Sequence, residues 1–130
     1  YKTKAVDIVM MCRMIRDEFA GRVPDTIEQL VKLPGVGRKT ANLIVGDLYG
    51  KPALVCDTHV IRVSGRIGLT DGTKDAFKVE KQLSAVIPPK DGLMLCHRLV
   101  WHGRLVCGAR APQCGECRLG AYCKFFSGKK

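Results

Sequence analysis

Two glycines and a lysine in the stretch 33–41 have the types and spacing to bind phosphate and supply a nucleophile. Gly35 and Gly37 follow a proline and precede an apolar periodicity typical of a helix. Glycine adopts positive φ and lets another backbone approach closely. A helix that begins here presents its first amide N–H groups and the positive end of its dipole, which together bind phosphate. Lys39 lies in the first turn of that predicted helix, beside the expected phosphate.

The Lys39 amine has three features that favour a nucleophile. A solvated surface charge and a simple phosphate contact stay open as the plainer alternatives. The helix N-terminus provides a positive potential, Arg38 adds a like charge, and a closed pocket around a substrate would remove water. Each of these effects disfavours the ammonium form. Together they make a free amine available for attack on an electrophilic carbon.

Asp57 is the second candidate, in the segment Val55-Cys56-Asp57-Thr58-His59. It precedes a predicted helix and has the residue type of an N-cap. A carboxylate held by the first amides of a helix stays ionised and fixed in position. It can then stabilise developing positive charge and assist proton transfer, so the capping and catalytic roles are compatible. We expect His59 and His102 to be hydrogen-bonded structural histidines.

Four cysteines near the C-terminus have the spacing of a metal or cluster site: Cys107, Cys114, Cys117 and Cys123. Four thiolates in the pattern Cys-x6-Cys-x2-Cys-x5-Cys can hold zinc or an iron–sulfur cluster. Structural zinc more often uses two separate Cys-x-x-Cys pairs, and this chain has a single pair. The total of seven cysteines is odd. This count argues against a fully paired disulfide framework and favours a reducing compartment.

These motifs together closely resemble the endonuclease III family of DNA repair glycosylases. Residues 33–41, Leu-Pro-Gly-Val-Gly-Arg-Lys-Thr-Ala, are similar to the family's helix-hairpin-helix motif. The segment around Asp57 and the cysteine spacing match as well. The resemblance covers essentially the whole chain but only the C-terminal part of the family's fold. Cys56 stands where many members carry a small aliphatic residue, a replacement of similar size.

The resemblance implies an all-α, helix-hairpin-helix DNA glycosylase fold. It consists of two helical lobes with a C-terminal Fe–S cluster loop, and the N-terminal part of the fold is missing. We expect a partial helical barrel lobe at 1–54, with the helix-hairpin-helix at 26–49. The second helical lobe at 55–130 would carry the cluster loop at 107–123. Four cysteines of that loop would hold a 4Fe-4S cluster as a structural staple. A redox role stays open and ranks below the structural one.

The resemblance also implies base-excision repair, in which oxidised pyrimidines are removed from duplex DNA and the strand is nicked by β-elimination. The damaged base would lie in a cleft with Lys39 on one side and Asp57 on the other. In members with lysine at this position, the amine attacks C1′ and forms a Schiff base. The DNA-binding residues that the match implies are Leu33, Gly35, Val36, Gly37, Arg38 and Thr40.

Two other functions stay open on the sequence. A non-catalytic DNA-binding module would use the hairpin and the cluster loop as a clamp, but a clamp needs neither Lys39 nor Asp57. A monofunctional adenine- or mismatch-specific glycosylase would belong to a branch that usually lacks lysine at this position. Lys39 therefore favours the bifunctional glycosylase and abasic-site lyase.

The composition agrees with a polyanionic partner. A net charge of +10 and a pI near 9.5 favour nucleic acid, although a basic surface without a specific partner would give the same values. We find no membrane-length apolar stretch and no signal-peptide pattern. The expected location is the cytoplasm, at the nucleoid, in a bacterium, and otherwise the nucleus or mitochondrion. Because the chain starts at Tyr1 in mid-pattern, we expect a piece of a longer glycosylase or a second chain that completes the fold.

Apolar periodicity predicts helices throughout and no β-strand. The expected first helix, 1–20, has an apolar stripe with Cys12 in the core. Asp25 and Glu28 predict a capping box for a short helix before the hairpin. The hairpin's second helix, at 38–49, is expected to bury one face, formed by Ala41, Ile44, Val45 and Leu48.

The second half of the chain is expected to hold three further helices. The first begins at Asp57 and ends before Gly68, and the others span about 74–87 and 91–106. Glycine, proline and cysteine should suppress regular structure after residue 107, and the tail 127–130 should be mobile. Buried positions expected in these helices are Val60, Ile61, Ser64, Ile67, Ala76, Val79, Leu83, Val86, Cys96, Leu99, Val100 and Gly103.

Overall fold

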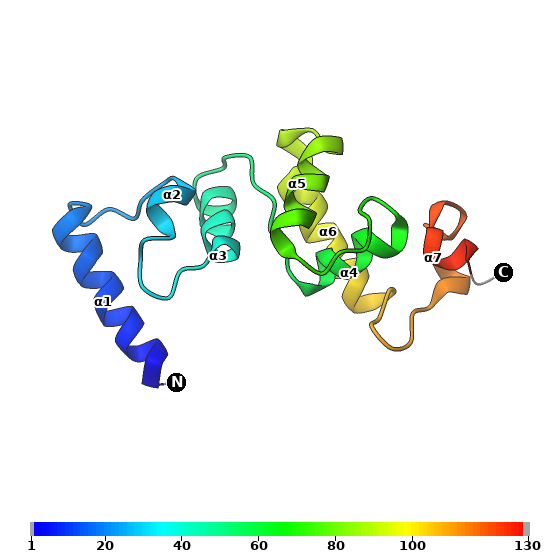
Figure 1. Cartoon of the computed structure of the whole chain (residues 1–130), viewed down its shortest axis with the longest axis horizontal. Helices are drawn as coiled ribbons and strands as arrows, with labels where there is room; N and C mark the ends of the chain where they lie inside the picture. The colour runs from blue at the N-terminus through cyan, green and yellow to red at the C-terminus, as the bar shows by residue number, and fades with distance from the viewer. Residues whose placement is uncertain (1, 129–130) are drawn as a thin grey trace. The chain divides into compact units, whose positions relative to one another are not determined.

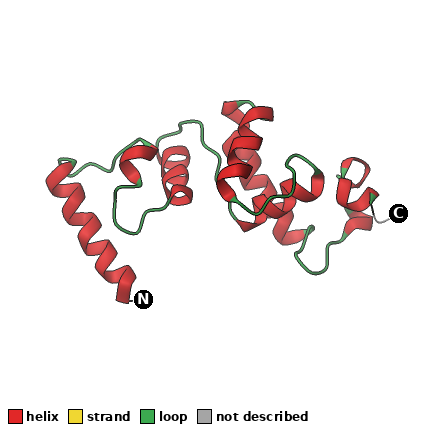
Figure 2. Ribbon diagram, in the orientation of Figure 1, coloured by secondary structure: helices red, strands yellow, loops and turns green. Residues whose placement is uncertain are grey.

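The computed structural model describes residues 2–128 as helices joined by loops (Figures 1 and 2). No β-strand occurs within that range, which confirms the predicted all-α class. The chain divides into two compact units, Tyr1–Lys51 and Pro52–Lys130. The predicted helical start at Tyr1 and the predicted mobility of residues 129–130 lie outside the described residues. No helix in 2–128 has the length and apolar character needed to cross a membrane.

The first unit contains three α-helices and a π-helical turn (Figure 1). In chain order these are α1 (Lys2–Glu18), α2 (Ile27–Leu30), α3 (Arg38–Leu43) and the π-helix η1 (Ile44–Leu48). The loop between α2 and α3 is the turn of the hairpin, and η1 continues α3 directly. The base of the hairpin is closed by the Tyr49 hydroxyl, which donates to the Val23 carbonyl.

The apolar stripe of α1 is not a core. None of the described α1 side chains is buried, and Ile8 is 56% exposed. Cys12 is also exposed, so its predicted place in the core is wrong. Within residues 2–51, the other elements cover these side chains only in part, since Met11, Met14 and Ile15 are half-buried. The periodicity identified the helix correctly, but a covered face requires a second layer of structure.

The cap of α2 lies one residue later than predicted. Thr26 has the extended backbone of an N-cap, and its Oγ1 accepts a hydrogen bond from the Gln29 amide at 3.4 Å. The predicted box of Asp25 and Glu28 is therefore wrong. Asp25 instead accepts a hydrogen bond from Lys51 Nζ, which lies 2.6 Å from its carboxylate, and this contact joins the two ends of the hairpin module.

The π-helical turn η1 changes which residues of the hairpin's second helix are buried. Ala41 and Val45 are buried as predicted, at 0% and 5% exposure. Leu48 was expected on the same face but is 64% exposed, while Asn42 and Gly46 are buried. A π-turn holds more residues than an α-turn, so the side chains that follow it rotate around the helix axis.

The second unit contains three longer helices and a cysteine-rich end. The longer helices are α4 (Thr58–Ile67), α5 (Ala76–Val86) and α6 (Gly92–Leu105), with a 3₁₀ turn η2 (Pro89–Asp91) before α6. After α6 come the 3₁₀ turns η3 (Cys114–Glu116) and η4 (Gly120–Tyr122) and the short helix α7 (Lys124–Ser127). The predicted lack of regular structure after residue 107 is therefore only partly right, and Ser127 belongs to α7.

The core of the second unit lies between α4, α5 and α6, and α4 packs extensively on α6. It includes the segment before α4, where Val55 and Cys56 are buried. Ala76 and Val86 were expected to be buried but are exposed, because they lie at the two ends of α5. The buried residues of this core are Val55, Cys56, Val60, Val63, Val79, Leu83, Cys96 and Leu99.

Candidate functional site

The hairpin turn places a compact set of polar groups at the start of α3. Leu33 is buried at 3% exposure, and its carbonyl accepts a hydrogen bond from the Val36 amide at 3.1 Å. Gly35 between them has a φ of +74°, a conformation that L side chains rarely adopt. Gly37 is the N-cap of α3 and supplies no side-chain hydrogen bond to the first turn.

Lys39 is the second residue of α3 and is exposed, as are Arg38 and Thr40 on either side of it. The three side chains therefore leave the first turn of a helix whose N-terminus has no side-chain cap. Such a terminus attracts negative charge through its partial positive charge. The structure thus brings the predicted nucleophile and the predicted phosphate-binding turn together in one unit.

Asp57 is the N-cap of α4, as the sequence predicts. Its Oδ1 accepts hydrogen bonds from the amides of His59 at 2.8 Å and Val60 at 2.9 Å. Among the described residues, no donor bonds to Oδ2. One carboxylate oxygen therefore anchors the side chain at the start of α4. Lys39 and Asp57 belong to different units, and their position on a common cleft stays a prediction from the resemblance.

The two histidines are hydrogen-bonded within the second unit. His59 Nδ1 lies 3.2 Å from an Arg62 guanidinium nitrogen. His102 Nε2 lies 3.6 Å from the sulfur of Cys117. Both contacts join side chains of the scaffold around α4 and the cysteine loop. They agree with the structural role expected for these two rings.

The four cysteines of the C-terminal loop line one cavity of the second unit, whose walls also include Ile67, Val106 and Leu119. Within residues 2–128, no three His, Cys, Asp or Glu side chains are arranged to hold a single metal ion. The wall of the cavity thus combines four thiols from one loop with apolar side chains. In number and type this donor set fits a 4Fe-4S cluster.

Arg66 fastens both arms of the cysteine loop to α4. Its guanidinium donates to the carbonyls of Gly108 and Ala109, each at 2.8 Å, and to the sulfur of Cys107 at 3.4 Å. Its own carbonyl accepts a hydrogen bond from the Cys123 thiol at 3.4 Å. One residue of α4 therefore contacts the first and the last cysteine of the loop.

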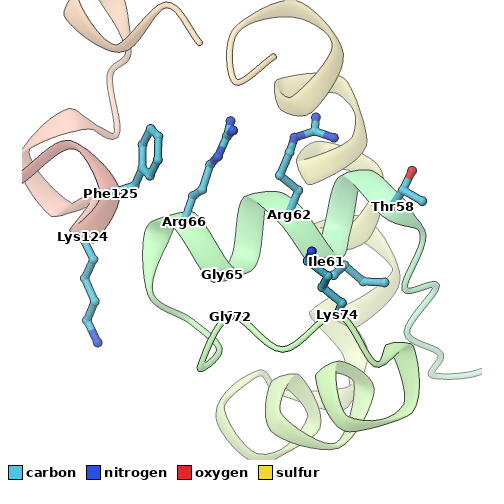
Figure 3. Close-up of a pocket in the computed structure, with 9 residues that line it drawn as sticks. All are labelled: Thr58, Ile61, Arg62, Gly65, Arg66, Gly72, Lys74, Lys124 and Phe125. Atoms are coloured by element: carbon cyan, nitrogen blue, oxygen red, sulfur yellow. The ribbon is translucent and has the colours of Figure 1, made fainter. Parts of the chain in front are cut away.

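Phe125 of α7 also packs against Arg66. The Arg66 guanidinium lies 4.6 Å from the centre of its ring, and Figure 3 shows the two side chains next to each other. Arg62, one helical turn earlier, donates to the carbonyls of Gly103 at 2.9 Å and Cys107 at 3.2 Å. Sequence reasoning singled out neither arginine. Arg62 and Arg66 are four residues apart, so they share a helix face. Their partners are backbone carbonyls, and no sequence pattern identifies such partners.

A surface cavity of about 710 Å³ lies along α4, with α7 on one side and the loop that precedes α5 on the other (Figure 3). Its lining includes Arg62 and Arg66, together with Lys74 and Lys124, and no acidic side chain. Figure 3 shows Lys124 extending away from the two arginines. This side of the second unit is therefore positively charged, in agreement with the basic composition of the chain.

Comparison with known proteins agrees with this geometry. Residues 18–46 match the model of the helix-hairpin-helix motif. A solved thymine-DNA glycosylase, 21% identical, has the same fold, with a TM-score of 0.84 over 95% of this chain and 58% of that chain. The helical arrangement and the hairpin therefore define a helix-hairpin-helix DNA glycosylase fold.

Within that fold class the chain is similar to endonuclease III. It is 44% identical to endonuclease III of Bacillus subtilis over 95% of its own length and 57% of the relative, and 38% identical to that of Escherichia coli over 96% and 59%. A structure of a trapped endonuclease III–DNA covalent intermediate is 41% identical, with a TM-score of 0.92 over 99% of this chain and 61% of that one. The chain thus spans about three-fifths of the relatives' length, which fits a C-terminal portion.

Proposed function

We propose that this chain carries the catalytic part of a base-excision DNA glycosylase with abasic-site lyase activity, acting on oxidised pyrimidines in duplex DNA. The observation that carries the proposal is the exposed Lys39 in the first turn of α3, directly after the glycine turn. A nucleotide inside the duplex cannot be reached, so it must be flipped out before reaction. The trapped covalent endonuclease III–DNA complex supports covalent chemistry of this kind.

In the proposed reaction the Lys39 amine attacks C1′ of the damaged nucleotide. A C1′–N bond to lysine forms, and the C1′–N bond to the base breaks, so that the base leaves and takes up a proton. Opening of the sugar ring gives a Schiff base. Loss of a proton from C2′ then expels the 3′-phosphate and nicks the strand. A monofunctional glycosylase has no need of this amine.

Asp57 is proposed as the acid–base and electrostatic partner. Two backbone amides fix its Oδ1, so the charge is positioned before the substrate binds. Its Oδ2 would face the positive charge that develops on the sugar and would assist the proton transfers. The assignment of Asp57 to the same reaction as Lys39 rests on the resemblance to endonuclease III.

The hairpin is proposed to hold the DNA backbone without reading sequence. Amides around Gly35 and Gly37 would bind phosphate oxygens, with Leu33, Val36, Arg38 and Thr40 completing the contact surface. This leaves recognition of the lesion to the pocket for the flipped base. The DNA substrate also sets the expected location, at the nucleoid or in a DNA-containing organelle.

The cysteine loop is proposed to hold a 4Fe-4S cluster through the thiolates of Cys107, Cys114, Cys117 and Cys123. When bound, the cluster supplies four iron–sulfur bonds that cross-link a loop with few buried apolar residues. Arg62 and Arg66 of α4 donate to the loop carbonyls of Cys107 and Gly108. The purified protein should therefore contain iron and sulfide and absorb visible light. Stoichiometric zinc without iron, in protein from its native host, would contradict this assignment.

We further propose that additional polypeptide, from a longer chain or a second chain, completes the fold. The apolar side chains of Val6, Ile8, Val9 and Met10 on α1 are half-exposed or more. Val6, Val9 and Met10 are spaced three and four residues apart and share a helix face. A large exposed apolar face is uncommon on soluble monomers. The isolated 130-residue chain should therefore associate, bind DNA weakly and in a salt-sensitive way, and show little base excision. A monodisperse monomer with full activity would contradict this.

The test of the proposed chemistry is borohydride trapping. At low salt and high protein concentration, a duplex with one abasic site should give a nicked strand and a covalent adduct. Lys39→Ala should abolish both products and leave DNA binding largely intact. Asp57→Asn keeps the cap but removes the charge, so folding should survive while turnover falls. Full trapping by Lys39→Ala would refute the nucleophile, and unchanged turnover in Asp57→Asn would leave Asp57 as a cap only.

A further inference from the structure

The turn of the hairpin lies directly against one side chain of α1. A Cβ added at Gly35 would stand 3.0 Å from the Cβ of Asp7 and 3.2 Å from its Oδ2. These distances are tighter than most real Cβ contacts, so a side chain at position 35 would push Asp7 aside by a few tenths of an ångström. Asp7 is half-buried at this contact. Both the positive φ of Gly35 and the packed side chain of Asp7 therefore favour glycine at this position.

The side chain in contact with the turn carries a negative charge. Within residues 2–128, Asp7 forms no ion pair, whereas the side chains that follow the turn at Arg38 and Lys39 are cationic. If the turn binds phosphate, the Asp7 carboxylate lies close to the bound anion. Like charges at such a separation repel, and the repulsion is strongest at low ionic strength.

We propose that Asp7 is a positioning and affinity-limiting residue of the hairpin. Its side chain supports the turn at Gly35 by packing, and its charge weakens the hold of the turn on DNA phosphate. This inference rests on the proposed function, in which the hairpin binds the DNA backbone. A weaker phosphate contact shortens the time spent on undamaged DNA, because backbone contacts are the same at every nucleotide.

Two variants separate the packing from the charge. Asp7→Asn keeps the shape of the side chain against Gly35 and removes the charge. Asp7→Ala removes both the charge and the atoms that touch the turn. The matched control is Glu18→Gln, which makes the same charge change on α1. It lies about 16 Å further along the helix axis, beyond the screening length at physiological salt.

The experiment measures binding of a labelled undamaged duplex by the 130-residue chain at about 50 mM and about 200 mM salt. Asp7→Asn should bind about two- to fivefold more tightly at the lower salt, and the gain should shrink at the higher salt. Asp7→Ala should bind more weakly than Asp7→Asn, and its hairpin amides should exchange hydrogen faster. Glu18→Gln should stay within the error of the unmodified chain.

The outcomes distinguish this inference from the function on which it rests. Gly35→Ala disrupts the turn and should weaken binding. If Gly35→Ala weakens binding but Asp7→Asn binds no more tightly than the unmodified chain, the proposed role of Asp7 is refuted. The proposed binding of DNA by the hairpin then still stands. Equal tightening by Glu18→Gln would also refute it, as an effect of net charge alone. If Gly35→Ala leaves binding unchanged, the hairpin does not hold DNA and the proposed function fails there.

Discussion

The two units of this protein differ in how they bury apolar side chains. In the second unit, α4, α5 and α6 enclose a continuous core in which Val60, Val63, Val79 and Leu83 are fully buried. In the first unit, α1 buries no described residue, and the buried side chains gather around the hairpin at Leu30, Leu33, Ala41 and Val45.

The two units therefore differ in what stabilises them. The second unit has three helices whose apolar faces cover one another, so its stability comes from its own packing. The first unit has a well-formed hairpin but a long helix with no covering layer. Its proposed nucleophile, Lys39, thus lies in the less covered of the two units. The predictions below test the contrast, from the largest expected effect to the smallest.

The largest expected difference between the two units is in the reactivity of their cysteine thiols. Burial raises the pKa of the Cys56 thiol to about 12 and that of Cys96 to about 11. At about pH 8, a thiol with a pKa near 12 is roughly a thousandfold less ionised than an ordinary cysteine thiol, and only the thiolate reacts. Alkylation followed by peptide mass spectrometry should label exposed Cys12 long before these two. Comparable labelling rates would show that the second core opens readily.

Truncation of an apolar side chain should be costly in the second unit only. Leu83 is 0% exposed, so Leu83→Ala should lower the free energy of unfolding by about 2–5 kcal/mol through lost burial and a cavity. Ile8→Ala in α1 is the matched control, with an expected change within about 0.5 kcal/mol at protein concentrations low enough to keep the chain monomeric. Hydrogen exchange resolved by peptide reports each unit separately. A large cost for Ile8→Ala would mean that association of the chain covers α1.

The cysteine loop should loosen when Arg66 is removed. Arg66→Ala leaves the carbonyls of Gly108 and Ala109 without their donor, which should cost about 1–3 kcal/mol. Limited proteolysis of residues 107–128 measures this locally. The control is Arg104→Ala, because Arg104 is exposed and its guanidinium lies 5.9 Å from the centre of the Trp101 ring. Equal protease resistance in the two variants would contradict the role of Arg66.

The smallest effect is expected at the base of the hairpin. The hydrogen bond and charge of Lys51 lower the pKa of Asp25 below its ordinary value of 3.8. Because the pKa is lowered on folding, the stabilisation is fully present above pH 3.8 and is lost as the pH falls through the folded pKa. Asp25→Asn should therefore change stability slightly at neutral pH and flatten its decline in acid. Acid titration of unfolding in both proteins measures this difference.

Local chemistry made much of the fold readable from the sequence. Asp57 caps α4 because a carboxylate before an apolar helix satisfies the first amides, a relation between neighbours in the chain. The glycine turn ahead of Lys39 is local in the same way. The register of α2 was misjudged by one residue, because Asp25 and Thr26 are both good caps and adjacent. A distant partner, Lys51, binds Asp25 and leaves Thr26 to cap the helix.

The sequence by itself determined the helices, the hairpin, the N-cap at Asp57 and the donor set of the cysteine loop. These depend on residue types and short spacings along the chain. The tertiary structure alone decided that Cys12 is exposed, that Leu48 leaves the buried face after a π-turn, that Arg66 joins both arms of the cysteine loop and that Asp7 lies against Gly35. Each of these depends on which elements meet in space, and periodicity within one helix carries no information about its neighbours.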